Sequence, residues 1–199
     1  MTRFVLIGAL LFGSGVWAAQ DVASALVRDV SERMLTVLEK RRADIDRDPS
    51  LIYELVDDIL VPHFDFDKIT RAAVGKYWRQ ATPPQKQALT KGFREVLIRT
   101  YARSLMSYTG QEIRYLPVTP GRRESTVTVS TEVREPGGPK VPVDYRMYLK
   151  NGKWQVYDVV IDHVSLVSNY RSSFNARIHR DGIDGLIRRL GEMNAKGQV

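Results

Sequence analysis

Apolar side chains recur every third or fourth position through the first part of the chain, which is the period of amphipathic helices. The first repeat runs from Val22 to Leu38 and ends in charged residues. The second follows Asp48-Pro49, because Asp suits a helix N-cap and Pro suits the first helical position. A third, shorter repeat runs from Asp67 to Gly75. This pattern predicts a helical lobe over residues 20–75.

The longest predicted helix begins at Thr82-Pro83-Pro84-Gln85, which has the sequence of a capping box with prolines in the first turn. Gly110 is expected to end it, because glycine is the usual residue just beyond a helix. Large apolar side chains recur on the predicted inner side of this helix: Leu89, Phe93, Val96, Leu97, Ile98, Tyr101, Leu105 and Tyr108.

From Gln111 onward apolar and polar positions alternate, which is the period of strands. Asn151-Gly152 is typical of a two-residue hairpin turn with positive φ. The strand after this turn, Trp154 to Ile161, is so apolar that we expect both of its faces to be buried. Trp154, Val156 and Val160 would face one way, and Tyr157, Val159 and Ile161 the other. Together with the runs at 113–115, 127–133 and 141–149, it predicts an antiparallel meander.

After Asp162 and His163 the helical period returns, and Asp181 is expected to cap a last helix. Helices first, sheet second and short helices last predict an α+β fold with a curved antiparallel sheet. The long helix that starts at Thr82 is expected to cover the concave face of this sheet. The predicted organisation is a signal peptide over residues 1–18 and a single domain over 19–199. Within that domain we expect a helical lobe at 20–75, the helix and sheet at 82–161, and C-terminal helices at 164–192.

The first residues of the chain have the order of a secretory signal peptide. Arg3 is followed by the apolar run from Phe4 to Phe12, and Val16-Trp17-Ala18 places small residues before a cleavage site near Ala18. The run is too short to span a bilayer. We therefore expect an exported, periplasmic protein, and export argues against nucleic acid as a partner.

Charge and composition add little to this picture. The 199 residues carry a formal charge of +7 and include no cysteine, so the fold has no disulfide. A positive surplus favours either anionic phospholipid surfaces or an acidic partner protein. Because lysine and arginine are dispersed along the chain, an ordinary solvated surface is the simplest interpretation of any single one.

Two groups of residues resemble catalytic or metal-binding sites. His63, Asp65 and Asp67 lie where helix-capping carboxylates are expected, and they are too few for the usual ligand set of a metal ion. Asp158 and His163 would suit a general base and acid if both pointed into a pocket. The simpler interpretation is a turn in which Asp162 acts as a cap and His163 is a loop residue. Neither group predicts catalysis, and no metal site or cofactor is expected.

Facing elements supply many large apolar side chains. They are either a filled core or the lining of an apolar cavity, and periodicity does not separate these two interpretations. The residues are Phe93, Leu97, Tyr101 and Leu105 of the long helix, Val127, Val129, Tyr145, Met147 and Leu149 of the sheet, and Tyr157, Val159, Val167 and Tyr170 of the last strand and helix.

Several motifs are spread over essentially the whole mature chain: Gly75-x-Tyr77-Trp78, Thr82-Pro83-x-Gln85, Thr100-Tyr101-Ala102, Trp154-x-Val156-Tyr157-Asp158-Val159-x-Ile161, Val164-Ser165-Leu166-Val167-x-Asn169-Tyr170-Arg171 and Ile183-x-x-Leu186-Ile187-x-x-Leu190. With these motifs the chain resembles the MlaC family, periplasmic phospholipid carriers of Gram-negative bacteria that are also called toluene-tolerance auxiliary components. One departure is His163, where a small residue, usually Gly, is typical.

The resemblance implies a sheet of the nuclear-transport-factor-two type and a carrier that holds a phospholipid by its tails, without catalysis. It implies two partners: an outer-membrane lipoprotein–porin complex, and an inner-membrane ABC transporter with a substrate-binding ring protein. Tyr77 and Trp78 join the apolar set above as expected lipid contacts, and Arg171 is expected at the headgroup rim. The alternatives are an enzyme that uses Asp158 or His163 in a cone-shaped pocket, and an adaptor that binds only proteins.

Overall fold

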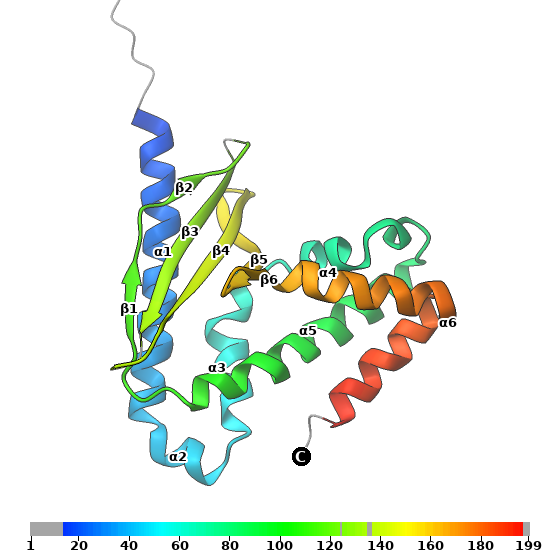
Figure 1. The fold of residues 1–199 in the computed structure, drawn as a ribbon, viewed down its shortest axis with the longest axis horizontal. Helices are drawn as coiled ribbons and strands as arrows, with labels where there is room; N and C mark the ends of the chain where they lie inside the picture. Colours follow the sequence, from blue (N-terminus) through cyan, green and yellow to red (C-terminus); the bar gives the residue numbers. More distant parts are fainter. Residues whose placement is uncertain (1–13, 124, 135–136, 197–199) are drawn as a thin grey trace, which may run out of the picture.

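The computed structural model describes residues 14–123, 125–134 and 137–196, so most of the predicted signal peptide lies outside the described residues. Helices precede and follow one antiparallel sheet (Figure 1). The elements are α1 (Ser14–Lys40), α2 (Arg42–Arg47), α3 (Leu51–Ile59), η1 (Val61–His63), α4 (Phe66–Val74), η2 (Gly75–Arg79), α5 (Pro83–Met106), β1 (Glu112–Tyr115), β2 (Thr119–Pro120), β3 (Thr126–Arg134), β4 (Lys140–Lys150), β5 (Lys153–Ile161), β6 (Val164–Ser165) and α6 (Leu166–Lys196).

The sheet is a meander in the order β1-β3-β4-β5-β6. The short β2 also pairs with β3, at Val127 and Thr128, on the same edge as β1. The predicted hairpin turn is confirmed, since Asn151 and Gly152 have φ of 50° and 76°. A β-bulge shifts the register of β5: Met147 pairs with Val156, whereas Arg146 pairs with Asp158. The extra residue brings Val156 and Val159 to the same face. The predicted assignment of these two residues to opposite faces was therefore wrong, because alternation restarts after a bulge.

A long helix covers one face of the sheet, as predicted, but it is α1 and not the helix that starts after Thr82 (Figure 1). Ala23 and Val27 of α1 are buried against Val127, Val129 and Met147. Val22, assigned to the buried stripe from its spacing, is 59% exposed.

The helix α5 packs mainly on α4, α6 and α3. Its predicted capping box is confirmed, with Thr82 and Gln85 each accepting a hydrogen bond from the other's backbone N–H. Phe93 is fully buried and lies edge-on to Tyr170 and Phe174, with both ring centroids 4.9 Å away. These contacts make a helical cluster distinct from the core beneath the sheet.

Two helix starts differ from the prediction. The helix α3 begins at Leu51, because the Asp48 carboxylate accepts the Ser50 N–H at 3.0 Å and so forms a turn first. Asp65, not Asp67, caps α4 by accepting the Lys68 N–H at 3.0 Å.

The C-terminal segment α6 consists of two helices joined at a kink, where Gly182 has non-helical angles of φ 70° and ψ 179° (Figure 1). The predicted α+β class, with a curved antiparallel sheet and helices at both ends of the chain, is confirmed. Within the described residues, no helix combines the length and the apolar composition that crossing a membrane requires.

Candidate functional site

An apolar cleft of about 560 Å³ lies between α1, the C-terminal end of α5 and the sheet. This volume falls within the range of about 300–1,000 Å³ typical of small-molecule sites. No described side chain that lines it is charged. The lining residues are Ser31, Met34, Leu35, Leu60, Ser104, Leu105, Ser107, Tyr108, Gln111, Ile113, Val133, Pro139, Val141 and Tyr145.

The wall on the side of the sheet follows from strand register. Val133 pairs with Ile113 of β1 and with Val141 of β4, so three aliphatic side chains stand in one row across neighbouring strands. Directly paired residues share a face of a sheet, and here that face is the one covered by α1 further along. Where α1 leaves the sheet, this row stays uncovered and becomes the wall of the cleft.

The opposite wall depends on the end of α5, where Leu105 projects into the cleft beside Tyr108. Arg42 holds this end in place, because its Nη1 donates to the carbonyl oxygens of Met106 and Tyr108 at 3.1 and 3.0 Å. The carbonyl groups of a last helical turn have no partners inside the helix, so a guanidinium there satisfies them.

A second hollow of about 410 Å³ lies on the other side of Leu105 and Tyr108. Leu38 and Ile45 contribute to its wall, and both are buried. Since Leu105 and Tyr108 border both hollows, the two adjoin at the end of α5, and the charged Glu39 and Arg42 also line the second one. Burial raises the pKa of the Tyr108 phenol, and the nearby Glu39 raises it further.

Tyr145 is the most strongly shifted titratable group in the described cleft lining. Burial raises the pKa of its phenol to about 12, and it makes a hydrogen bond with the buried Thr131. The phenol is therefore neutral throughout the physiological range. The cleft presents hydrocarbon and neutral hydroxyl or amide groups, an arrangement that suits an apolar ligand and gives it a few hydrogen-bonding positions.

Of the residues predicted to contact lipid, Leu105 and Tyr145 line this cleft. Leu149 is 42% exposed near the end of β4. Tyr157 packs on Tyr148, with their ring centroids 5.9 Å apart. The other members fall into two packed groups. Tyr77, Trp78, Phe93, Leu97, Tyr101, Val167 and Tyr170 belong to the helical cluster, and Val127, Val129, Met147 and Val159 belong to the core between α1 and the sheet.

Sequence reasoning missed the aliphatic row of Ile113, Val133 and Val141 as site residues. Alternation along one strand already placed Val141 on the face of Tyr145, whereas Ile113 and Val133 share that face through the strand register that the structure shows. Met34 and Leu35 were not accessible in this way, because the pattern of α1 does not say which surface it packs against.

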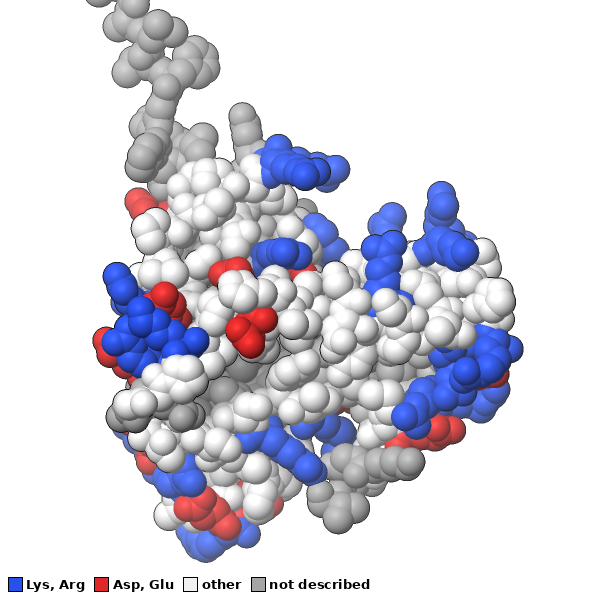
Figure 2. All heavy atoms as spheres, viewed as in Figure 1, with Lys and Arg blue, Asp and Glu red and all other residues white. Residues whose placement is uncertain are grey.

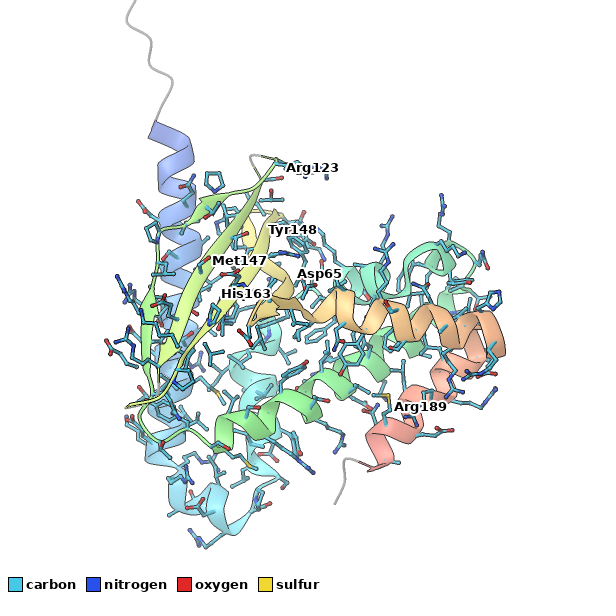
Figure 3. All side chains as sticks on the ribbon, viewed as in Figure 1. Asp65, Arg123, Met147, Tyr148, His163 and Arg189 are labelled. Atoms are coloured by element: carbon cyan, nitrogen blue, oxygen red, sulfur yellow. The ribbon has the colours of Figure 1, made fainter. Side chains whose placement is uncertain are left out.

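Asp158 and His163, the candidate acid and base, have other roles. Asp158 is buried and accepts hydrogen bonds from Arg146 Nη1 at 3.0 Å, Ser165 Oγ at 2.6 Å and the Val167 N–H at 3.1 Å. It thereby fixes the start of α6 against β4 and β5. His163 is exposed in the tight turn before β6, with a φ of 64° (Figure 3).

Asp65 of the His63-x-Asp65-x-Asp67 motif has partners of its own. Its carboxylate accepts hydrogen bonds from Lys150 Nζ at 2.7 Å and from the Tyr148 hydroxyl (Figure 3). In the part of the chain that the structure describes, no group of three or more His, Asp or Glu side chains is placed to hold a metal ion.

The chain is similar to known proteins over most of its length. Residues 28–192 match the family model described as MlaC protein. The chain is 28% identical over 162 residues to the toluene tolerance protein Ttg2D of Pseudomonas putida, covering 80% of this chain and 74% of that one. It is 22% identical over 191 residues to the intermembrane phospholipid transport system binding protein MlaC of Haemophilus influenzae, covering 94% and 88%.

A solved structure matches most of this arrangement of helices and sheet. It is the phospholipid-binding protein of Ralstonia solanacearum in complex with a phospholipid, at 1.53 Å resolution. The TM-score is 0.82 and the identity 32%, over 89% of this chain and 99% of that one. Because the family model spans most of its residues, this chain belongs to the MlaC family.

Proposed function

We propose that this protein is a periplasmic carrier that binds a phospholipid by its acyl chains and moves it between the outer and inner membranes, which maintains outer-membrane lipid asymmetry. The observation that supports this most directly is the cleft without charged side chains among its described lining residues. It lies in a fold that matches a phospholipid complex over nearly its whole length.

The energetics explain why a carrier is needed. Two acyl chains contain on the order of 30 methylene groups, and exposing them to water costs roughly 25 kcal/mol at about 0.8 kcal/mol each. A lipid therefore does not cross an aqueous compartment unaided at a useful rate. An apolar cleft that replaces the bilayer interior removes most of this cost, while a headgroup left at the mouth stays hydrated.

The tails are proposed to occupy the space around Leu105 and Tyr145 first. A full pair of tails needs more room than one cleft of about 560 Å³, and the adjoining hollow beyond Tyr108 extends it. The packed residues Val127, Val129 and Met147 reach a lipid only if α1 separates from the sheet. Movement of the helices relative to the sheet is thus the proposed route to loading and release.

The cellular location of the protein and its partner proteins belong to the same proposal. The predicted signal peptide of residues 1–18 supports export to the periplasm. The Haemophilus relative is named for an intermembrane phospholipid transport system. We infer that an inner-membrane ABC transporter with a substrate-binding ring protein and an outer-membrane lipoprotein–porin complex exchange lipid with this protein.

The decisive experiment is native mass spectrometry of the purified protein, with organic extraction to identify what it carries. We expect phospholipid at about one molecule per chain. Val133→Trp should reduce the bound lipid severalfold, because the larger side chain fills the row between Ile113 and Val141.

The matched control is Val164→Trp, at a position that is 53% exposed and outside the described cleft lining. It should bind lipid as the unmodified protein does. A preparation without fatty material would instead favour an adaptor that binds only proteins. Equal lipid loss in both variants would show that the lipid binds outside this cleft.

A further inference from the structure

A larger cleft of about 1,060 Å³, separate from the two hollows described above, lies where the helical cluster meets β4. Alternation along β4 places it on the other side of the sheet, since Tyr148 and Lys150 point away from the face of Tyr145 and Met147. Seven cationic side chains and two carboxylates line it. The lining is Asp65, Asp67, Lys68, Arg71, Ala72, Gly75, Lys76, Trp78, Arg79, Pro83, Lys86, Gln87, Tyr148, Lys150 and Arg171.

Both carboxylates of this basic cleft already have partners. Asp65 accepts hydrogen bonds from Lys150 and Tyr148, and Asp67 accepts one from the Thr90 hydroxyl at 3.0 Å. The cleft therefore carries a surplus of five positive charges, against +7 for all 199 residues. Most of the net charge of the chain is gathered in this one place.

Six of the seven cations form no ion pair among the described residues. Elsewhere many arginines are paired, for example Arg94 with Asp57 at 2.8 Å. The unpaired ones in the cleft are Lys68, Arg71, Lys76, Arg79, Lys86 and Arg171. Lys and Arg side chains also stand along the upper edge of the helical part in Figure 2, with few carboxylates among them.

Two details describe the wall of the cleft. Gly75, with φ of 64°, lies beside the Arg171 guanidinium, and a Cβ added at Gly75 would lie about 3.4 Å from it, at ordinary van der Waals distance. Trp78 adds a half-buried aromatic wall, with Lys86 Nζ 5.8 Å from its ring centroid. Arginine and tryptophan are the residue types enriched where proteins bind each other.

We propose that this basic cleft docks an acidic segment of a partner protein. The cations are spread over α4, η2, α5, β4 and α6, so they match several separate carboxylates better than one phosphate group. They line a hollow, which an extended polypeptide can enter and a flat bilayer surface cannot. Opposite charge across the contact speeds encounter and sets orientation.

The position of the cleft gives docking a purpose that rests on the proposed function. Because it lies on the other side of the sheet, a partner bound there leaves the apolar cleft unobstructed for lipid to enter or leave. The same docking contact then serves a loaded and an empty carrier.

The test is binding of a fluorescein-labelled octaglutamate peptide, followed by anisotropy at low and high ionic strength. We expect saturable binding that weakens with salt, and no binding of an octaglutamine peptide. The triple variant Arg71→Gln, Lys76→Gln, Arg79→Gln should weaken the affinity roughly tenfold, as expected for the loss of three exposed charge contacts. All three side chains are exposed, so the fold should persist.

The control removes the same charge elsewhere, with Arg33→Gln, Lys40→Gln and Arg134→Gln at exposed positions outside the basic cleft. It should bind the peptide almost as the unmodified protein does. Equal weakening in both triple variants, or no peptide binding at all, would overturn the proposal. Binding to vesicles that contain phosphatidylglycerol, without peptide binding, would overturn it in favour of a membrane surface. Peptide binding by a protein that carries no lipid would support docking while contradicting the carrier.

Discussion

Asp65 joins the helices to the sheet through one buried carboxylate. It caps α4, accepts hydrogen bonds from Tyr148 and Lys150 of β4, and donates its own N–H to the Val156 carbonyl at 2.9 Å. Burial by itself raises the pKa of Asp65, but the hydrogen bonds that it accepts outweigh burial and lower this pKa below its usual value. Burial and the contact with Asp65 together raise the pKa of Tyr148 to about 12.

Asp65→Asn should lower the free energy of unfolding by about 1–3 kcal/mol at pH 7, because the amide cannot replace the charged acceptor. The folded-state pKa is depressed, so the contribution of the carboxylate is present above the unfolded-state pKa of about 3.9 and is lost as the pH falls through the folded-state value. Urea unfolding at several pH values should show that the free energies of unfolding of the unmodified protein and of Asp65→Asn converge as the pH falls below about 4.

The neighbouring Asp67→Asn is the control for this measurement, since Asp67 is exposed and accepts a side-chain hydrogen bond from Thr90. It should cost less than about 0.5 kcal/mol, as is usual for exposed positions. A constant difference between the unmodified protein and Asp65→Asn down to about pH 2 would show that the carboxylate does not titrate in this way.

At the scale of elements, the turn between β5 and β6 decides how α6 begins. Asp162 and His163 both have positive φ, at 47° and 64°, in the turn that returns the chain to pair Val160 with Ser165. Ser165 then caps α6 by accepting the Ser168 N–H at 3.1 Å. The turn therefore aligns this cap with the buried Asp158. A histidine tolerates this conformation, although glycine adopts it more easily.

His163→Val should lower the free energy of unfolding by about 1 kcal/mol or more, because a β-branched side chain strongly disfavours positive φ. His163→Gly should leave stability unchanged or raise it slightly. His179→Val, at an exposed position in α6, controls for the loss of the imidazole and should cost only a few tenths of a kcal/mol. Thermal and urea unfolding of the three variants measure the effect; equal costs at positions 163 and 179 would show that the turn is not strained.

The elements themselves were largely predictable, because each depends on local chemistry. Thr82 and Gln85 form the capping box that their spacing indicates, and Asn151-Gly152 makes the hairpin turn. The helix that covers the sheet was not predictable. Both α1 and α5 carry an apolar stripe, and periodicity shows that a stripe is buried without showing against what. The bulge in β5 was hidden for a similar reason, since no residue type marks it.

At the scale of the whole molecule, folding brings together side chains that lie far apart in the sequence. The cations of the basic cleft lie as far apart in sequence as Lys68 and Arg171, and nothing in the sequence marks them as neighbours. The apolar cleft is likewise assembled from α1, α5 and three strands. Apolar composition alone does not distinguish a filled core from a cleft, because hollowness depends on how far apart the walls are held. Arg42, which holds the end of α5, contributes to that separation.

Lipid loading should change the dynamics of the cleft without changing the packed clusters. A ligand that binds only the folded state raises the free energy of the openings that disrupt its site. Hydrogen exchange at short labelling times, where local opening dominates, should therefore slow on loading in residues 31–35 and 104–113, which line the apolar cleft. Residues 174–178, whose ends Phe174 and Ile178 are buried in the helical cluster, should exchange at the same rate in both states.

The comparison uses protein freed of lipid by unfolding and refolding, measured before and after loading from phospholipid vesicles. Loading must restore the exchange of the protein as purified, which shows that refolding itself caused no change. Slower exchange concentrated in residues 68–79 would place the lipid in the basic cleft instead. Slowing confined to the walls of the apolar cleft would tie lipid binding to a hollow whose described lining carries no charge and leaves room between its walls.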